Sequence, residues 1–117
     1  MTLLSNLAPQ VPTVAGLVPT FTSLGSNTGM TFQNTGKELI LVATTGNGTT
    51  VTEKIGSTVQ GQSVTAPTVT VQATTPTPEI LGPFPSDYNA PGGNTVELDF
   101  SSSTGVSVAV IRFQGVV

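Results

Sequence analysis

The sequence predicts an all-β protein: a single β-sandwich or jelly-roll-like domain with an extended N-terminal arm. Helix signals are nearly absent, because no long segment keeps a helical apolar period without an interrupting Gly, Pro or β-branched run. Short runs rich in Val, Ile and Thr recur along the chain, and these residues favour pleated, half-buried strands. Turn residues separate the runs, and strands at this spacing are typical of a sandwich or small jelly roll.

The length of the chain, 117 residues, is that of one domain with one hydrophobic core. We assign residues 1–15 to the arm and residues 16–117 to the sandwich. The expected strands span residues 16–24, 30–33, 37–45, 50–55, 68–73, 78–82, 94–101 and 105–113. Gly, Asn, Pro and Ser supply the expected turns at 34–36, 46–48, 61–62, 91–94 and 103–105.

Alternation along the strands predicts which side chains face the core. In the strand at 94–101, the apolar Val96, Leu98 and Phe100 point to one side. The acidic Glu97 and Asp99 point to the other side, where we expect solvent. This strand therefore has one buried and one exposed face.

Two strands, at 39–43 and 106–113, are apolar on both faces. A strand of this kind is covered on both sides. The second cover is either another chain or a loop of the same chain, and the sequence leaves both alternatives open. It also leaves open which face is core and which is interface. The candidate subunit-interface residues are Ile40, Val42, Val110, Ile111 and Phe113.

The first fifteen residues carry several aliphatic side chains, but Pro9 and Pro12 oppose regular structure. Such a segment cannot bury its own side chains. We expect an extended arm that becomes ordered on a partner, and the alternative is a frayed terminus. The candidate contact residues of the arm are Leu3, Leu4, Leu7, Val11 and Val14.

The composition argues against several classes of function. Charged residues make up 8% of the chain, and the net charge is −3 with only three Lys and Arg residues. Three scattered cations are too few for the phosphate contacts of a nucleic-acid-binding protein or for a basic membrane-binding surface. A surface poor in charge suits a protein that packs against others.

The residue types needed for catalysis are also scarce. The chain has no His and no Cys, so the common bases and thiol nucleophiles are missing. Lys37 and Lys54 each lie beside a Glu and are expected to be ordinary solvated charges. Glu97 and Asp99 supply too few oxygens for a Ca²⁺ site. We expect no enzymatic activity, no cofactor and no metal.

The stretch GPFPSDYN, residues 82–89, concentrates aromatic and turn residues, including the only Tyr of the chain. Two prolines end the preceding strand, and Pro85 to Tyr88 suits a type I turn. We expect a structural corner with the Tyr88 ring inside, and the alternative is an exposed aromatic platform for a ligand. The candidate corner residues are Pro83, Phe84, Pro85, Asp87, Tyr88 and Asn89.

Several segments together resemble a group of small virion proteins of tailed bacteriophages. They are GLVPTFTSL (16–24), NTGKELILV (34–42), TVTV (68–71), GPFPSDYN (82–89) and SVAVIR (107–112). The resemblance covers about residues 15–113, and its most specific part is GPFPSDYN. Proteins of this group are taken to be capsid decoration, or cement, proteins. The resemblance implies a β-sandwich or jelly-roll fold, trimers on the capsid surface and no enzymatic activity.

The leading hypothesis is a decoration protein that binds the outer surface of the major capsid protein lattice and stabilises the head. Its partners are then the major capsid protein and two further copies in a homotrimer, without nucleic acid or membrane. It is made in the host cytoplasm and located on the virion. The alternatives are a tail or head–tail connector subunit, and a carbohydrate-binding β-sandwich module that uses Tyr88, Asp87 and Asn89.

Overall fold

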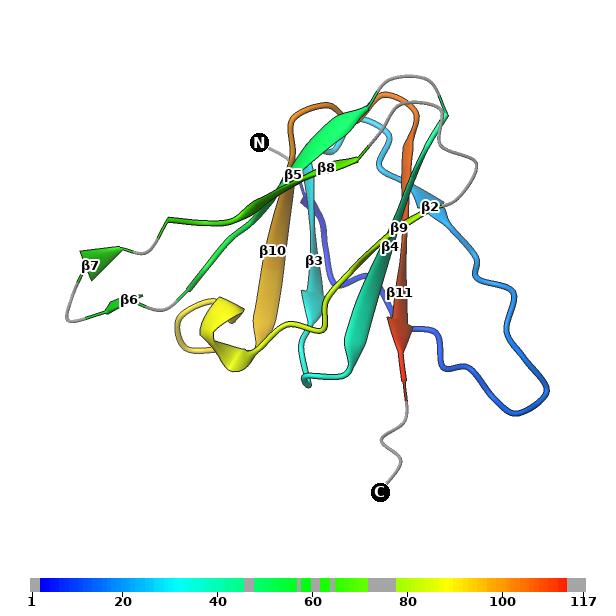
Figure 1. Cartoon of the computed structure of the whole chain (residues 1–117), viewed down its shortest axis with the longest axis horizontal. Helices are drawn as coiled ribbons and strands as arrows, with labels where there is room; N and C mark the ends of the chain where they lie inside the picture. The colour runs from blue at the N-terminus through cyan, green and yellow to red at the C-terminus, as the bar shows by residue number, and fades with distance from the viewer. Residues whose placement is uncertain are drawn as a thin grey trace.

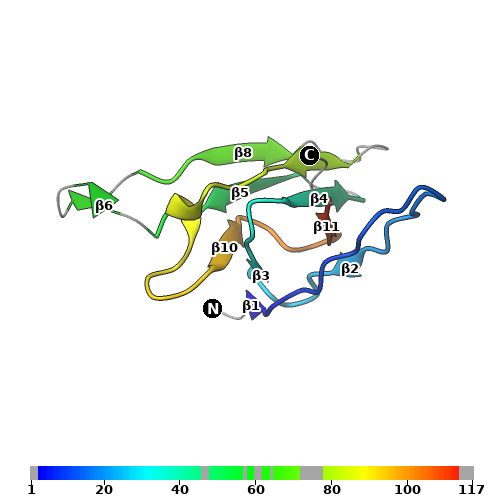
Figure 2. The same ribbon diagram turned by 90° about the horizontal axis from the view of Figure 1, so that it is seen from below.

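Two β-sheets packed face to face form the body of the protein, as Figures 1 and 2 show from two directions. The computed structural model describes residues 3–45, 48–56, 58–59, 62–63, 65–71 and 78–113. Within these ranges there is no α-helix, and the only helical element is the 3₁₀ turn η1 (Ser86–Tyr88). The predicted all-β sandwich is therefore confirmed.

The first sheet has five strands in the order β1, β3, β10, β5, β8. Their bounds are β1 (Leu3–Leu4), β3 (Gly29–Gln33), β10 (Thr95–Phe100), β5 (Thr49–Glu53) and β8 (Thr68–Val71). All neighbours are antiparallel except β1 and β3, which run parallel.

The second sheet has four antiparallel strands in the order β2, β11, β4, β9. Their bounds are β2 (Thr22–Ser23), β11 (Val106–Arg112), β4 (Glu38–Thr44) and β9 (Glu79–Leu81). A small hairpin of β6 (Thr58–Val59) and β7 (Gln62–Ser63) projects from one side of the sandwich (Figure 1).

Most expected strands match the structure, and one does not. The strands expected from residue 30 onward correspond to β3, β4, β5, β8, β9, β10 and β11. The strand expected at 16–24 is wrong, because only Thr22–Ser23 pairs in a sheet. Residues 46–47, 61 and 72–73, on which part of the expected turns and of the strand at 68–73 fall, lie outside the described residues.

The core lies between the two sheets and follows the predicted alternation. Val96, Leu98 and Phe100 of β10 are buried, as expected. Across from them lie alternate residues of β4 and β11. The core cluster comprises Leu24, Met30, Phe32, Ile40, Val42, Val51, Val71, Leu81, Phe84, Val96, Leu98, Phe100, Val106, Val108 and Val110.

The structure decides which face of the doubly apolar strands is core. Ile40, Val42 and Val110 belong to the core cluster and are 0% exposed, so the intramolecular core, and not a subunit contact, accounts for these three candidates. Ile111 lies on the opposite face of β11 and is 8% exposed. Phe113, just beyond β11, is half-buried.

The outer faces of the two sheets differ in chemistry. On the first sheet, Glu97 faces outward opposite Thr31, and Asp99 lies between Gly29 and Thr52. The second sheet presents apolar side chains in register across β11, β4 and β9. We call this the outer apolar face, and its residues are Leu39, Leu41, Ala43, Ile80, Ala109 and Ile111.

The outer apolar face is largely shielded within the chain itself. Ala109 and Ile111 are buried, Leu39 and Leu41 are half-buried, and Ile80 is 59% exposed. The uncovered apolar surface is therefore smaller than the sequence suggests, and it centres on Ile80 at the β9 edge.

The N-terminal segment differs from the expected division at residue 15. Leu3–Leu4 form the edge strand β1, and the Leu7 N–H donates to the Thr31 carbonyl at 3.1 Å. Gln10 then pairs with β11 of the other sheet, donating its N–H to the Val110 carbonyl at 2.8 Å. Because Leu4 and Leu7 also pack against the core, residues 3–10 are part of the sandwich.

Candidate binding sites

A loop between Gln10 and Thr20 projects away from the sandwich, on the side opposite the β6–β7 hairpin (Figures 1 and 2). The Gln10 side chain closes its base: Nε2 donates to the Thr20 carbonyl at 2.8 Å, and Oε1 accepts from the Thr20 N–H at 2.9 Å. At the tip, the Gly16 N–H donates to the Thr13 carbonyl at 2.8 Å. Gly16 has a φ of +97°, which favours glycine. We call residues 11–19 the Val14 loop.

Most side chains of the Val14 loop are apolar and exposed. Val14 is 109% exposed and Val18 is 88% exposed, while Val11 and Leu17 are 37% and 38% exposed. Soluble proteins seldom gather exposed apolar side chains in one place unless the surface binds a partner. Among the predicted arm residues, Val11 and Val14 lie on this loop, whereas Leu3, Leu4 and Leu7 lie against the sheets.

The stretch 82–89 connects β9 to the start of β10 and contributes to the core. Phe84 is 3% exposed and contacts the Phe32 ring with centroids 5.4 Å apart. The Tyr88 ring meets Phe84 edge-on at 5.7 Å. This arrangement is favourable for aromatic pairs, so it anchors the end of η1 to the core.

A buried amide holds this stretch in place. Asn34 is 6% exposed, and its Nδ2 donates to the Phe84 carbonyl at 3.0 Å and to the Asn89 Oδ1 at 2.9 Å. Pro83, Pro85 and Asp87 point to solvent, while Tyr88 and Asn89 are half-buried. The stretch therefore combines a buried Phe with a Tyr that also faces outward.

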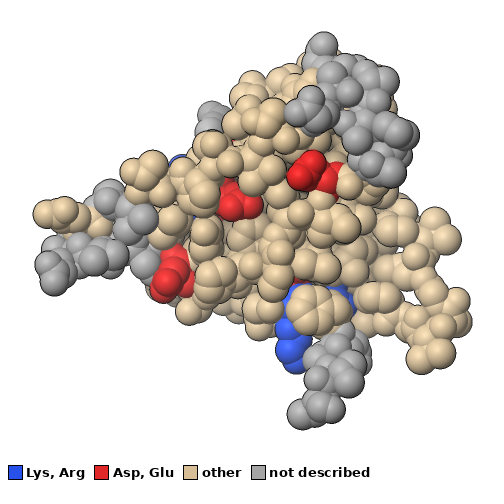
Figure 3. Space-filling model, in the orientation of Figure 1, with Lys and Arg blue, Asp and Glu red and all other residues tan. Residues whose placement is uncertain are grey.

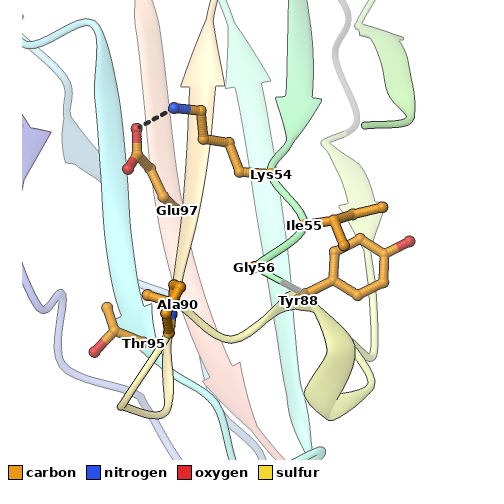
Figure 4. A pocket seen from close by; sticks show the side chains of 8 residues that line it. Lys54, Ile55, Gly56, Tyr88, Ala90, Thr95 and Glu97 are labelled. Atoms are coloured by element: carbon orange, nitrogen blue, oxygen red, sulfur yellow. Dashed lines mark ion pairs between the residues drawn. The ribbon is translucent and has the colours of Figure 1, made fainter. Parts of the chain in front are cut away.

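The outward side of Tyr88 borders a hollow of about 230 Å³, which we call the Tyr88 pocket (Figure 4). Its lining residues are Lys54, Ile55, Gly56, Tyr88, Ala90, Pro91, Thr95 and Glu97. In Figure 4, Tyr88 and Ile55 lie together on one side, and Lys54 and Glu97 lie on another. Local sequence patterns do not connect Lys54 or Glu97 with Tyr88, because only the pairing of β5 with β10 brings them together.

Charges at the top of the pocket interact with one another. Lys54 Nζ lies 3.6 Å from Glu97 Oε2 and 3.6 Å from Asp99 Oδ2. A hydrogen bond shared with Asp99 raises the pKa of Glu97, and partial burial and the negative charge of Asp99 raise it further, against the effect of Lys54. The described residues contain no group of three or more His, Cys, Asp or Glu side chains placed to hold a metal ion.

A second polar cluster is structural. Glu38 is 0% exposed and accepts hydrogen bonds from the Thr35 N–H at 2.7 Å, the Thr35 hydroxyl at 2.8 Å and the Arg112 guanidinium. Burial alone would raise the pKa of Glu38, but the hydrogen bonds from Thr35 and Arg112 outweigh it and lower the pKa. Arg112 also borders a hollow of about 310 Å³ beside Asn6 to Pro9, but Glu38 already neutralises its charge.

Charge is sparse on the molecular surface. In Figure 3, acidic and basic side chains form small separated patches in a surface of uncharged residues.

Comparisons with families of proteins, with curated proteins and with solved structures found no match for this chain. Among the described residues, no helix has the length and hydropathy needed to cross a lipid bilayer.

Proposed function

We propose that this protein is a capsid decoration, or cement, protein of a tailed bacteriophage. In this role it binds the outer surface of the major capsid protein lattice and stabilises the head. The observation that carries the proposal is the Val14 loop, an apolar protrusion with a fixed base. The sequence resemblance over residues 15–113, above all in GPFPSDYN, supports the same function.

The Val14 loop is suited to insertion between subunits of a lattice. Val14 and Val18 are almost fully exposed in the free protein, so nearly all of their apolar surface is available for burial. Burying one valine side chain contributes about 1.5–3 kcal/mol. Because the Gln10–Thr20 hydrogen bonds already define the base of the loop, less conformational entropy is lost when it binds.

The proposal includes self-association as a homotrimer, in keeping with the resemblance. The remaining exposed part of the outer apolar face, at Ile80, is the surface we assign to this contact. A closed ring covers the same patch on every copy and matches a three-fold axis of the capsid. Several loops of one trimer then bind the lattice at once, which raises the apparent affinity.

Binding to heads that lack this protein tests the proposal. The double variant V14S/V18S should occupy such heads at least about tenfold less than the unsubstituted protein at the same concentration, because two buried valines are lost. The variant I80S removes an exposed apolar residue away from the loop. It should show a smaller mass in light scattering, and because it loses the multivalency of the trimer but keeps the loop, it should still reach full occupancy of heads at a higher concentration.

Two outcomes would contradict the proposal. Equal occupancy of heads by V14S/V18S and the unsubstituted protein would exclude the Val14 loop as the docking element. Absence of the unsubstituted protein from heads, with binding to isolated tails instead, would identify a tail or connector subunit.

A further inference from the structure

We propose that the Tyr88 pocket is a binding site for a single neutral sugar ring. This site is separate from the Val14 loop and is not required for capsid binding. It lies on the first sheet at the η1 end, where residues that follow β5 meet the segment between η1 and β10.

The walls of the pocket have the two kinds of surface that a pyranose requires. Tyr88, Ile55 and Pro91 are the large apolar residues of the lining, and residues of this kind suit the C–H face of a sugar ring. Lys54, Glu97 and Thr95 supply donors and acceptors for the hydroxyl groups. Figure 4 shows Tyr88 and Ile55 on a different side of the pocket from Lys54 and Glu97.

The charges of the site favour a neutral ligand. Within the lining, Lys54 contributes one positive charge and Glu97 one negative charge, so the two charges balance. An anion such as a phosphate would face the Glu97 carboxylate, and a cation would face Lys54. A hydroxyl group, in contrast, both accepts and donates, so it can accept from the Lys54 ammonium and donate to the Glu97 carboxylate.

The spacing of the ion pair leaves room for this interaction. Lys54 Nζ and Glu97 Oε2 are 3.6 Å apart, which is longer than a direct hydrogen bond. Neighbouring hydroxyl groups of one sugar ring can therefore bind these two side chains together. The volume of about 230 Å³ is below the usual range for drug-sized ligands, so the pocket fits one ring rather than an oligosaccharide.

Close backbone packing forms the pocket before any ligand binds. A Cβ atom placed on Gly56 would lie 1.7 Å from the Asn89 carbonyl oxygen, so only glycine fits at this position. The Gly56 N–H donates to the Asp87 carbonyl at 3.2 Å. These contacts hold the chain after β5 against η1 and fix the distance between Ile55 and Tyr88.

The fluorescence of Tyr88 provides a direct assay. The chain has one Tyr and no Trp, so intrinsic emission reports on this pocket alone. The probes are D-glucose, D-galactose, D-mannose and N-acetyl-D-glucosamine, each titrated into the full chain. We expect a saturable change with at least one sugar, with a dissociation constant in the millimolar range.

Variants then assign the binding to the polar wall. E97Q should weaken binding about tenfold, because it replaces a charged acceptor with a neutral one. E79Q, a carboxylate removed from the exposed strand β9 of the other sheet, is the matched control and should leave binding unchanged. Amide chemical shifts of the sugar-bound protein should change at Gly56, Thr95 and Glu97.

The proposal is overturned if none of the four sugars gives a saturable change at concentrations up to about 100 mM, well above a millimolar dissociation constant. Saturation by inorganic phosphate would identify an anion site instead. Equal sugar affinities for E97Q and the unsubstituted protein would exclude Glu97 as a residue that binds the sugar. Head occupancy of E97Q is measured in parallel, and it should not change, since the Val14 loop is intact.

Discussion

The side-chain amide of Gln10 substitutes for a backbone partner of Thr20. It donates to the Thr20 carbonyl at 2.8 Å and accepts from the Thr20 N–H at 2.9 Å, as a neighbouring strand would. The backbone of the same residue pairs with β11 through Val110 and Arg112. One residue therefore fixes the Val14 loop to the second sheet.

Replacing this side chain should loosen the loop without unfolding the domain. Q10A removes two hydrogen bonds at the surface and should lower the free energy of unfolding by about 1 kcal/mol. Amide hydrogen exchange should become faster at Thr20. The exposed Gln33 on β3 supplies the control Q33A, and equal exchange at Thr20 in both variants would contradict this role for Gln10.

Phe84 and Tyr88 should differ in their contributions to stability. F84A removes a side chain that is 3% exposed and packed on Phe32, so it should lower the free energy of unfolding by about 3–5 kcal/mol. Y88A removes a half-buried ring and should cost less, about 1–2 kcal/mol. Denaturant unfolding measures both values, and a larger loss for Y88A would contradict the assignment of Phe84 as the buried member of the pair.

Gly56 should not tolerate a methyl group. In G56A the new Cβ would clash with the Asn89 carbonyl oxygen, so the chain after β5 must separate from η1. We expect a loss of about 1–3 kcal/mol, typical of overpacking. Gly93 lies in open space, and G93A is the matched control with no loss of stability. Thermal unfolding of the two variants is the measurement, and equal melting temperatures would refute the close approach.

Glu38 should stabilise the fold at neutral pH and lose this effect in acid. Its pKa is lowered in the folded protein, so its contribution is present above the unfolded pKa of about 4.3 and is lost as the pH falls through the folded pKa. E38Q should lower the free energy of unfolding by about 2 kcal/mol or more at pH 7, because Arg112 loses its charged partner. The difference in free energy of unfolding between E38Q and the unsubstituted protein should shrink as the pH falls below the unfolded pKa. A difference independent of pH would contradict the lowered pKa of Glu38.

Ionisation of Glu97 should have the opposite effect on stability from ionisation of Glu38. Its pKa is raised by Asp99 and by burial, so ionisation of Glu97 disfavours the folded state as the pH rises toward 7. E97Q should therefore stabilise the protein at pH 7, and the gain should vanish below the unfolded pKa, where the carboxyl is protonated in both states. Denaturant unfolding at both pH values is the check, and a loss of stability at pH 7 would show that the Lys54 ion pair outweighs the repulsion.

The sequence predicts strands well where one face alternates, as in β10. It fails where hydrogen bonds come from a distant side chain. The run at 16–24 has the composition of a strand, but the Thr20 backbone bonds to Gln10. Composition also cannot choose the core face of β4, because Leu39 and Leu41 are as apolar as Ile40 and Val42.

The candidate sites also include one feature that local sequence patterns reveal and one that they do not. The aromatic and turn residues of 82–89 are visible in the sequence as a distinctive stretch. The pocket beside Tyr88 is not visible, because it depends on strand order and on the close approach of Gly56 to Asn89. Both of these are long-range properties, which local patterns do not encode.

The parallel pairing of Gln10 with β11 also determines how the domain responds to mechanical force. Tension between the chain before residue 3 and the chain after residue 113 first loads the pairing of β1 with β3 and the Leu7–Thr31 hydrogen bond. Once these contacts break, the tension pulls Gln10 and β11 in opposite directions along their common axis. The Gln10–Val110 and Arg112–Gln10 hydrogen bonds, 2.8 and 2.9 Å long, are then loaded together in shear. They must break at the same time, whereas the bonds of a hairpin pulled from its open end break one after another. The N-terminal segment thus acts as a mechanical clamp across both sheets.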